Sequence, residues 1–348
     1  MPWAVFAGPG SAVKPLGALG TAALAVGGAE TGLGTGNIRH EAFLYRGDVG
    51  FLSASRDFVL AGLAADEDVL IMLSEPRMSL LRGALGRAGR RVEFIDIVEV
   101  GRNPARLIPT WQEFIEKGAE QGRVVRGIGE PVWSGRTGPE LAECMLHEAL
   151  TNEAFPGPAS WRLRCIYESS ALDPATDDLV WRTHPLVVKG GLARPSTRFH
   201  PVPGARGGPV GPAGDLFAEP LSDLGPPWSA LSFGPADLGL VRAAAAAAAR
   251  AVRLGRDRVG DLELSVHEVA TNSVRHGGGQ GTVRFWPGQG GLVCEVADAG
   301  QVADRLAGRR RPALDLGGGR GLWLVNQLCD LVQLRSAATG TTVRMFIH

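Results

Sequence analysis

Two stretches of the sequence repeat the same spacing of residues that could do chemistry. LSVHEVATNSVRHGGG (264–279) and MLHEALTNEAFPGP (145–158) both contain His-Glu, three further residues and Asn. On a helix, Glu268 and Asn272 would share one face because they are four residues apart. An amide oxygen there can ligate Mg²⁺, and a carboxylate one turn earlier can accept a proton from an attacking hydroxyl. Alone, this pattern is equally typical of a solvated polar face.

Three further features follow the downstream stretch in order. VCEVADAG closes a predicted strand with Asp298 and Gly300. Gly317–Gly321 then opens a predicted helix, where backbone N–H groups suit a phosphate. Gly340 and Thr341 precede the last predicted strand. Together with the Glu-x-x-x-Asn spacing, this set resembles the four boxes of the GHKL ATPase family, which includes gyrase, histidine kinases and bacterial anti-sigma kinases.

The resemblance covers residues 228–348 and implies a two-layer α/β sandwich, the Bergerat fold, that binds ATP and Mg²⁺. It implies that Asn272 holds the Mg²⁺ ion, that Asp298 accepts the adenine amino group, and that the loop Gly319–Gly321 wraps the phosphates. Thr341 would support the adenine pocket. The nucleotide-binding set implied by the family is Asn272, Arg275, His276, Asp298, Gly300, Gly319, Arg320, Gly321, Leu322 and Thr341.

The short lid between Gly300 and Gly317, and the residues TNSVRHG after Glu268, resemble the serine-kinase branch of anti-sigma factors. Proteins of that branch bind a sigma factor and phosphorylate a serine of a STAS-type anti-anti-sigma partner. The resemblance implies that Glu268 is the general base on that serine. In non-kinase relatives, the same residue only orders a water.

Two departures from the family pattern concern the phosphate side of the site. Val302 stands where the family often has the second glycine of DxGxG, and Gly317 and Gly318 stand where some members carry an arginine. Arg320 or the Arg309–Arg311 run could supply the missing cation, or these side chains could simply be solvated. The departures therefore bear on kinase turnover rather than on ATP binding.

Two other functions fit parts of the pattern. A sensor histidine kinase shares the ATP-binding fold but needs a phosphoacceptor histidine on a helical hairpin directly before it. That place is taken here by a segment rich in Pro and Gly, in which His200 lies among prolines. The second alternative is a non-catalytic sigma-binding module in which ATP only supports the structure.

Short apolar runs alternate with helical spacing in residues 38–190. VLIMLS (69–74) and VEFIDI (92–97) are typical of buried parallel strands, and the sequence between them has helical spacing. This alternation predicts a three-layer α/β domain. HEAFLYRGDVGFL, GRNPARLIPTWQEF, VRGIGEPVW and ELAECMLHEALTNEAF resemble the MEDS sensory domain, which is often joined to an anti-sigma-type ATPase. The resemblance implies a RecA-like core that senses an unknown small molecule.

Ligands of open α/β sheets lie beyond the carboxyl ends of the strands. This rule nominates seven residues as a sensory site: Glu75, Arg77, Arg102, Asn103, Arg126, Glu130 and Trp133. Each could instead be a helix cap, a surface charge or part of the core. The upstream echo at His147 and Glu148 lacks the boxes that follow a nucleotide motif, so we expect it to be structural or to line a cleft. VLIMLSEPR contains no GxxxxGK, so a P-loop is not supported.

Composition limits the remaining choices. The 348 residues carry a formal net charge of zero, which gives no general attraction to nucleic acid or to an anionic membrane. The four cysteines occur singly, at Cys144, Cys165, Cys294 and Cys329. Without a CxxC pair they argue against a disulfide framework or a zinc site, and they indicate a reducing cytoplasm. No segment is long and apolar enough to span a membrane.

Two segments fall outside the predicted domains. Residues 1–37 are rich in Gly and Ala and predict a disordered leader, whereas residues 191–227 have few large apolar side chains and predict a linker that cannot pack a core. The Ala-rich helix after the linker could pack closely enough to form a homodimer. We therefore expect a cytoplasmic anti-sigma regulator with a sensory domain at 38–190 and an ATP-binding serine kinase domain at 228–348.

Overall fold

The first strand shows why the N-terminal sheet is covered on both faces. Along β1 (Ile38–Tyr45), Ala42 and Leu44 belong to one buried apolar cluster, whereas Phe43 and Tyr45 belong to another. Successive side chains of a strand point to opposite faces, so both faces of this sheet are packed. The computed structural model describes residues 38–155, 161–200, 211–288, 290–312 and 319–348. The leader predicted at residues 1–37 lies outside this description.

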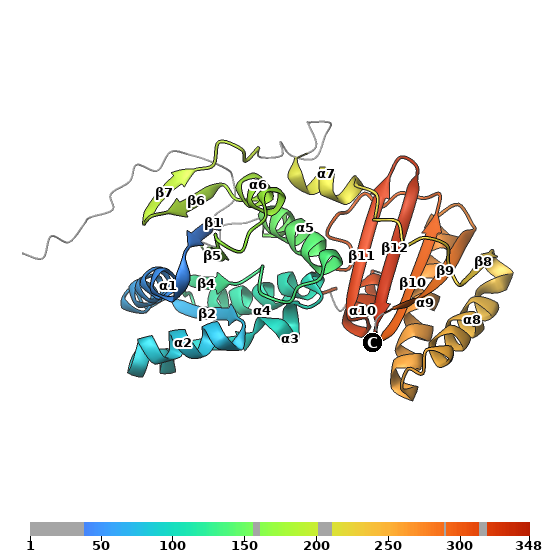
Figure 1. Ribbon diagram of the computed structural model, residues 1–348, viewed down its shortest axis with the longest axis horizontal. Coiled ribbons are helices and arrows are strands. Elements are labelled where there is room, and N and C mark those ends of the chain that lie inside the picture. Colours follow the sequence, from blue (N-terminus) through green and yellow to red (C-terminus); the bar gives the residue numbers. More distant parts are fainter. Residues whose placement is uncertain (1–37, 156–160, 201–210, 289, 313–318) are drawn as a thin grey trace, which may run out of the picture. The chain divides into compact units, whose positions relative to one another are not determined.

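Seven strands form the N-terminal sheet in the order β3-β2-β4-β5-β1-β6-β7 (Figure 1). After β1 they are β2 (Asp68–Leu73), β3 (Val92–Asp96), β4 (Val125–Gly129), β5 (Trp161–Glu168), β6 (Leu186–Lys189) and β7 (Leu192–Pro195). Neighbouring strands are parallel except for β6 and β7, which pair antiparallel. The carboxyl ends of β2, β4, β5 and β1 therefore lie side by side.

Helices form the two outer layers of this half. They are α1 (Gly47–Ala64), α2 (Glu75–Leu85), α3 (Ile97–Gly101), α4 (Leu107–Glu120), α5 (Gly138–Ala154) and α6 (Pro174–Thr183), with 3-10 turns at Gly86–Arg91 and Pro104–Arg106. Phe51 of α1 and Met78 of α2 pack in the cluster that contains Phe43. Phe114 of α4 and Met145 of α5 pack in the opposite one. The predicted three-layer α/β architecture is confirmed.

Helix α5 begins where its sequence signals a start. The Thr137 hydroxyl accepts a hydrogen bond from Glu140 N, and the Glu140 carboxylate accepts one from Thr137 N, which completes a capping box. Pro139 lies in the first turn, where a missing backbone N–H costs nothing. Ten of the 17 residues of α5 are buried, so the charged side chains of Glu143 and Glu148 need partners inside the protein.

The strand predicted at 92–97 ends one residue early. The Asp96 carboxylate accepts a hydrogen bond from Val98 N at 2.8 Å and caps α3. An acid at this position satisfies a free N–H group of the first helical turn, so Ile97 begins a helix instead of extending β3.

A second sheet of five antiparallel strands forms the C-terminal half, in the order β11-β12-β10-β9-β8. The strands are β8 (Ser229–Phe233), β9 (Gly281–Gly288), β10 (Gly291–Asp298), β11 (Leu331–Ala337) and β12 (Gly340–Ile347). The helices are α8 (Leu238–Ala251), α9 (Arg256–His276) and α10 (Arg320–Leu328). Apolar residues of α8 and α9 share a buried core with the strands, so the predicted two-layer sandwich is confirmed.

The segment predicted as a linker contains a packed helix. Pro212 occupies the first turn of α7 (Pro212–Ala218), a position that suits its fixed backbone angle. Ala213 and Phe217 of this helix are buried among core residues of the C-terminal sheet. The expectation that this composition cannot pack a core is therefore wrong for α7, because Phe217 and its small buried neighbours form an apolar face, to which the partly buried Leu216 adds.

The described residues from Ile38 to His348 belong to one compact unit. Within it, Arg106 donates hydrogen bonds to the carbonyl oxygens of Asn326, Gln327 and Cys329 at 2.8, 2.9 and 2.8 Å. Carbonyl groups at the end of a helix lack intrahelical partners, so Arg106 caps α10. None of the helices in the described residues combines the length and apolar character that a bilayer crossing requires.

Candidate functional site

Asp298 ends β10, where two neighbours orient its carboxylate. Ser273 Oγ donates a hydrogen bond to Asp298 Oδ2 at 2.6 Å, and Gly300 N donates to Asp298 Oδ1 at 2.8 Å. A carboxylate has about four acceptor positions on its two oxygens. Asp298 therefore keeps acceptor capacity for a donor, such as an amino group, in the cavity beside it.

Glycines allow α9 to approach the end of β10. A methyl group added to Gly277, just after α9, would overlap the Asp298 carboxylate. One added to Gly300 would lie 2.5 Å from His276 O. The φ angle of Gly277 is −98°, so the close approach rather than backbone strain requires glycine there. A larger residue at either position would displace Asp298.

Thr341 connects the last strand, β12, to the end of β10 around Asp298. It lies opposite Asp298 in the pairing of β12 with β10, and its hydroxyl donates to Gly300 O at 2.8 Å. Ser336 Oγ lies 3.0 Å from the Thr341 hydroxyl and accepts a hydrogen bond from Val302 N at 2.8 Å. One chain of hydrogen bonds thus connects β11, β12 and the segment that follows β10.

Glu268 and Asn272 lie on α9 beside the start of α10. A methyl group built on Gly321 would lie 2.7 Å from Glu268 Oε2 and 3.6 Å from Asn272 Nδ2. Both side chains therefore face the backbone of Gly321, as their four-residue spacing predicts. Gly319 precedes α10 with a φ of +83°, a left-handed conformation that favours glycine, and the free N–H groups of the first turn suit an anion.

A cavity of about 710 Å³ joins these features. Its lining includes eight of the residues that the sequence nominates for nucleotide binding: Asn272, His276, Asp298, Gly300, Gly319, Gly321, Leu322 and Thr341. Val269, Leu334 and Val343 add apolar wall. A cavity of this volume, lined by both apolar and polar side chains, suits a ligand of nucleotide size.

Three nominated residues lie outside this lining. Glu268 does not line the cavity itself, although its carboxylate lies beside Gly321, which does. Arg275 is exposed at the end of α9, and Arg320 is exposed at the start of α10. The adenine and magnesium candidates are therefore brought together, whereas these arginines line no part of the cavity as it stands.

The arginine run of the lid divides between two positions. Arg310 and Arg311 are exposed and line the cavity. Arg309 is only 2% exposed, and its guanidinium pairs with Glu143 of α5 at 2.5 Å. Arg309 is thus held in an internal ion pair, and of this run only Arg310 and Arg311 are placed to meet a phosphate.

Two serines of this site are absent from the sequence-based assignment. Ser273 directly follows Asn272 on α9, and its spacing of four residues from Val269 places it on the buried face of that helix. This neighbourhood could have indicated a residue that orients Asp298. Ser336 gives no such signal, because only the pairing of β11 with β12 brings it next to Thr341.

Comparison with known families assigns both halves of the chain. Residues 39–185 match the MEDS family, the MEthanogen/methylotroph, DcmR Sensory domain. Residues 231–347 match the histidine kinase-like ATPase domain. The chain therefore carries a MEDS sensory domain followed by a histidine kinase-like ATPase domain, which confirms the resemblances to the MEDS domain and to the GHKL ATPase family. No curated protein matches the chain.

Among solved structures, the chain is similar to the RsbU and RsbW domains of Rv1364c from Mycobacterium tuberculosis. The identity is 18% and the TM-score is 0.27, over 34% of this chain. This chain spans about a third of the length of that one, at 32% coverage. A likeness of this size carries no argument about fold or function.

Two of the nominated sensory residues lie at the carboxyl ends of the parallel strands. The Glu130 carboxylate follows β4 and accepts hydrogen bonds from Ser74 N at 2.8 Å and Ser74 Oγ at 2.6 Å. Burial raises the pKa of Glu130, and the Ser74 hydrogen bonds oppose this effect. Arg77 lies over the Tyr45 ring, 5.3 Å from its centroid, and pairs with Asp48 at 2.5 Å. These side chains form a polar group at the predicted end of the sheet.

Other nominees have structural partners. Arg126 lies near the start of β4, away from the carboxyl ends of the strands, and forms a buried ion pair with Glu67 at 2.5 Å. Asn103 is buried, and its amide donates to Asn326 O at 3.0 Å. The remaining nominees, which are exposed or half-buried, are Glu75, Arg102 and Trp133.

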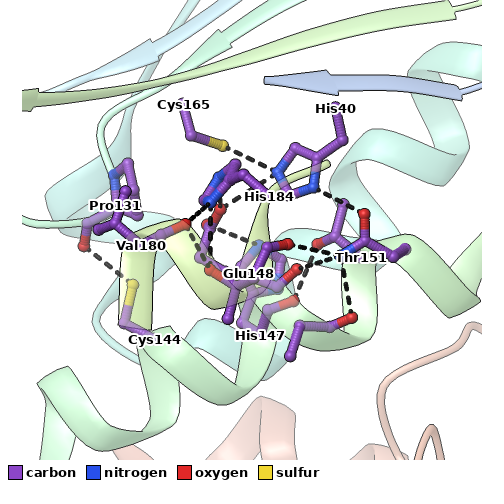
Figure 2. Close-up of polar contacts among 12 residues, drawn as sticks. His40, Pro131, Cys144, His147, Glu148, Thr151, Cys165, Val180 and His184 are labelled. Atoms are coloured by element: carbon purple, nitrogen blue, oxygen red, sulfur yellow. Dashed lines mark hydrogen bonds and ion pairs between the residues drawn. The ribbon is translucent and has the colours of Figure 1, made fainter. Parts of the chain in front are cut away.

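His147 and Glu148, from the upstream stretch that repeats the His-Glu-x-x-x-Asn spacing, lie in a buried polar cluster (Figure 2). Glu148 is surrounded there by His40, Cys165 and His184. His147 is also buried, its Nδ1 has no hydrogen-bond partner in the described part of the chain, and burial lowers its pKa to about 4. Sequence reasoning nominated Glu148 and His147 but missed the other three, which are far apart in the chain and share no motif.

Proposed function

We propose that this chain is an ATP-binding anti-sigma regulator. In this proposal the ATPase domain binds Mg·ATP, sequesters a sigma factor and phosphorylates a serine of a STAS-type anti-anti-sigma partner. The MEDS domain senses a small molecule and controls that activity. The family match supports an ATP-binding regulatory domain, and the serine-kinase resemblance of the sequence around Glu268 supports the choice of partners.

The arrangement around Asp298 carries the proposal for ATP. Ser273 and Gly300 N orient the carboxylate, Gly277 leaves room for it, and the remaining lone pairs are available beside the cavity. An ionised acceptor in a fixed orientation suits the amino group of adenine. The apolar side chains of Val269, Leu334 and Val343 in the lining suit the faces of the base.

The phosphate side supports a transfer reaction. Asn272 lies beside the start of α10, so its amide oxygen would ligate Mg²⁺ together with phosphate oxygens. When bound, the ion neutralises charge that develops on the phosphates. Glu268 is one turn away on the same helix face and would accept the proton of the attacking serine hydroxyl. The N–H groups at the start of α10 would bind the phosphates.

Control of the sigma factor follows from competition. A sigma factor and a STAS partner would share a surface of the ATPase domain, and the nucleotide would set which of them binds more tightly. A ligand shifts such an equilibrium only by its different affinity for the two states.

The deciding experiment incubates the full chain with labelled ATP and candidate STAS proteins. Acid-stable phosphoserine on a STAS protein is the expected product. ATP binding without transfer would instead favour a non-catalytic sigma-binding module. Acid-labile label on the chain itself would favour a histidine kinase, although His200, the candidate acceptor in the linker, is exposed and lies outside any helix.

A further inference from the structure

Four side chains of the MEDS domain converge in a buried cluster that the proposed function does not use (Figure 2). His40 of β1, Glu148 of α5, Cys165 of β5 and His184 after α6 each offer one ligand atom, and these atoms all lie within 4.8 Å of one another. Each residue is at most 2% exposed. We propose that these four residues, the His/Glu/Cys cluster, bind zinc or a related divalent transition-metal ion.

The distances in the His/Glu/Cys cluster are close to those of a tetrahedral site. His40 Nε2 lies 3.2 Å from Glu148 Oε2 and 3.4 Å from Cys165 Sγ, and His184 Nε2 lies 2.9 Å from Glu148 Oε2. A tetrahedral zinc ion with its usual bond lengths holds neighbouring ligand atoms about 3.3–3.8 Å apart. The remaining ligand atoms also lie within 4.8 Å of one another, so modest movements of the side chains are enough to admit an ion.

Asn152 determines which nitrogen of His40 faces the cluster. The Asn152 amide nitrogen donates to the carbonyl oxygens of Glu148, Ala149 and Thr183, at 3.2, 3.3 and 2.8 Å. The Asn152 oxygen is therefore the atom 3.1 Å from His40 Nδ1, and because an amide oxygen only accepts, Nδ1 must carry the proton. In a neutral ring, His40 Nε2 then carries no proton, and its lone pair is directed into the cluster.

His184 is arranged in the same way. Its Nδ1 lies 2.9 Å from Val180 O, which can only accept, so this nitrogen also donates. Its Nε2 then presents a lone pair to Glu148 Oε2, which is itself an acceptor. Metal-ligating histidines usually donate their second N–H to a carbonyl or carboxylate group, and both rings do so here.

The cluster thus brings three acceptor atoms, two imidazole nitrogens and a carboxylate oxygen, together with few protons: the nearby donors are the Cys165 thiol and the buried Tyr167 hydroxyl. The Cys165 thiol has one proton and can satisfy only one of its neighbours. Without an ion, the His184–Glu148 contact needs an added proton on the carboxylate or on the ring, because both atoms are otherwise acceptors. A metal ion satisfies all four atoms at once.

The charges of the cluster also suit a divalent ion. In the described part of the chain, the ion pairs of Glu148 are formed with histidines alone, and no lysine or arginine lies within ion-pair distance of it. An unpaired buried carboxylate is costly. A divalent cation with one thiolate and one carboxylate has a net charge of zero, so the loaded site can be buried at lower cost.

The ligand set favours zinc over magnesium or calcium. Sulfur and imidazole ligands suit zinc and related transition metals, whereas the hard cations prefer oxygen. Four protein ligands in a buried position are typical of a closed, structural site. The ion would join β1, β5, α5 and the end of α6, so its occupancy would control the stability of the sensory domain.

The test uses the full chain, stripped of metal with a chelator, and adds Co²⁺ or Zn²⁺ alone. Co²⁺ bound by a thiolate in a tetrahedral site absorbs strongly through ligand-to-metal charge transfer. We expect this band to saturate at one ion per chain, Zn²⁺ to abolish it by displacement, and Zn²⁺ to raise the Tm of the stripped protein.

Matched cysteine variants locate the ion. Cys165→Ser should lose the charge-transfer band. Mutating a residue that only contacts a metal ligand weakens metal affinity roughly 10–100-fold, and we expect the loss of a ligand itself to weaken it more. Cys144→Ser is the control, because this second buried thiol donates to Pro131 O at 3.0 Å and lies outside the cluster. It should keep the band and the affinity.

Two results would overturn the proposal. The first is that the folded, metal-free wild-type chain shows neither the band nor a rise in Tm when the ion is added. The close contacts of the cluster would then be explained by protonated histidines. The other is an unchanged band in Cys165→Ser. If Cys165→Ser does not fold, the wild-type titration still decides. Mg·ATP binding does not involve a thiolate, so failure here leaves the proposed ATP site standing.

Discussion

At the scale of single residues, Asp298 is the position where a small chemical change is most informative. Replacing it by Asn keeps its shape and its contact with Ser273 but removes the charge that strengthens a hydrogen bond to an amino group. A hydrogen bond to a charged group contributes about 1.5–3 kcal/mol, so we expect ATP affinity to fall about tenfold to hundredfold. Calorimetry with Mg·ATP measures this. Asp257→Asn, an exposed site in the first turn of α9, should leave the affinity unchanged.

Glu268 separates binding from chemistry. In Glu268→Gln the amide still fits against Gly321 but cannot accept a proton, so we expect wild-type ATP affinity. Phosphate transfer to a STAS protein should fall by about 10²–10⁴-fold, the usual contribution of a general base. Glu263→Gln, on the same helix and paired with Arg242 at the surface, is the control for transfer. Transfer at the wild-type rate in Glu268→Gln would show that Glu268 is not the base.

At the scale of elements, the glycine inside α9 and the glycine directly after it have opposite requirements. Gly260 lies inside the helix with nothing within 4 Å of an added methyl group, so Gly260→Ala should stabilise the protein by about 0.5–1 kcal/mol. Gly277 follows the helix, and its added methyl group would overlap the Asp298 carboxylate. We expect Gly277→Ala to weaken ATP binding. Thermal unfolding and calorimetry on both variants test this pair, and equal ATP affinity in the two would contradict the packing argument.

Periodicity predicted the elements with long, regular patterns and missed those that depend on their neighbours. The apolar run at 69–74 has a clear pattern and occurs as β2, and the spacing of Glu268 and Asn272 occurs on α9. The edge strands β8 and β11 were not predicted. β8 pairs with the distant β9, and β11 forms a hairpin with β12 directly after α10, so neither strand is marked by alternation along its own residues. Helix α7 was missed because a Pro/Gly-rich composition hides one buried Phe217.

The same distinction applies to the sites. Eight residues that line the cavity beside Asp298 could be predicted, because they lie in four short boxes that are each visible in the local sequence. The His/Glu/Cys cluster could not, because His40 and Cys165 meet only through the parallel pairing of β1 with β5. Single cysteines argued against a zinc site on the assumption that such a site needs a CxxC pair. A search for CxxC pairs does not detect a cluster that contains only one cysteine.

At the scale of the whole molecule, α5 connects residues of both domains through Glu143. This carboxylate is fully buried and lies 2.5 Å from both the Arg309 and the Arg335 guanidinium. Removing one partner of a buried ion pair leaves uncompensated charge and costs about 3–5 kcal/mol. In Glu143→Gln two buried guanidinium groups would lose their carboxylate, so we expect a loss of that size in the free energy of unfolding, measured with urea.

The same helix supplies the control for this effect. Glu153, also on α5, pairs with Arg305 at 3.0 Å, but both side chains are partly exposed. Such pairs contribute at most about 1 kcal/mol, so Glu153→Gln should change stability little. Arg309 lies between Gly308 and Arg310, which both line the nucleotide cavity. If α5 transmits the state of the sensory domain, Glu143→Gln should therefore also alter ATP affinity, whereas Glu153→Gln should not. Equal affinities in the two variants would mean that this buried ion pair supports the fold without influencing the ATP site.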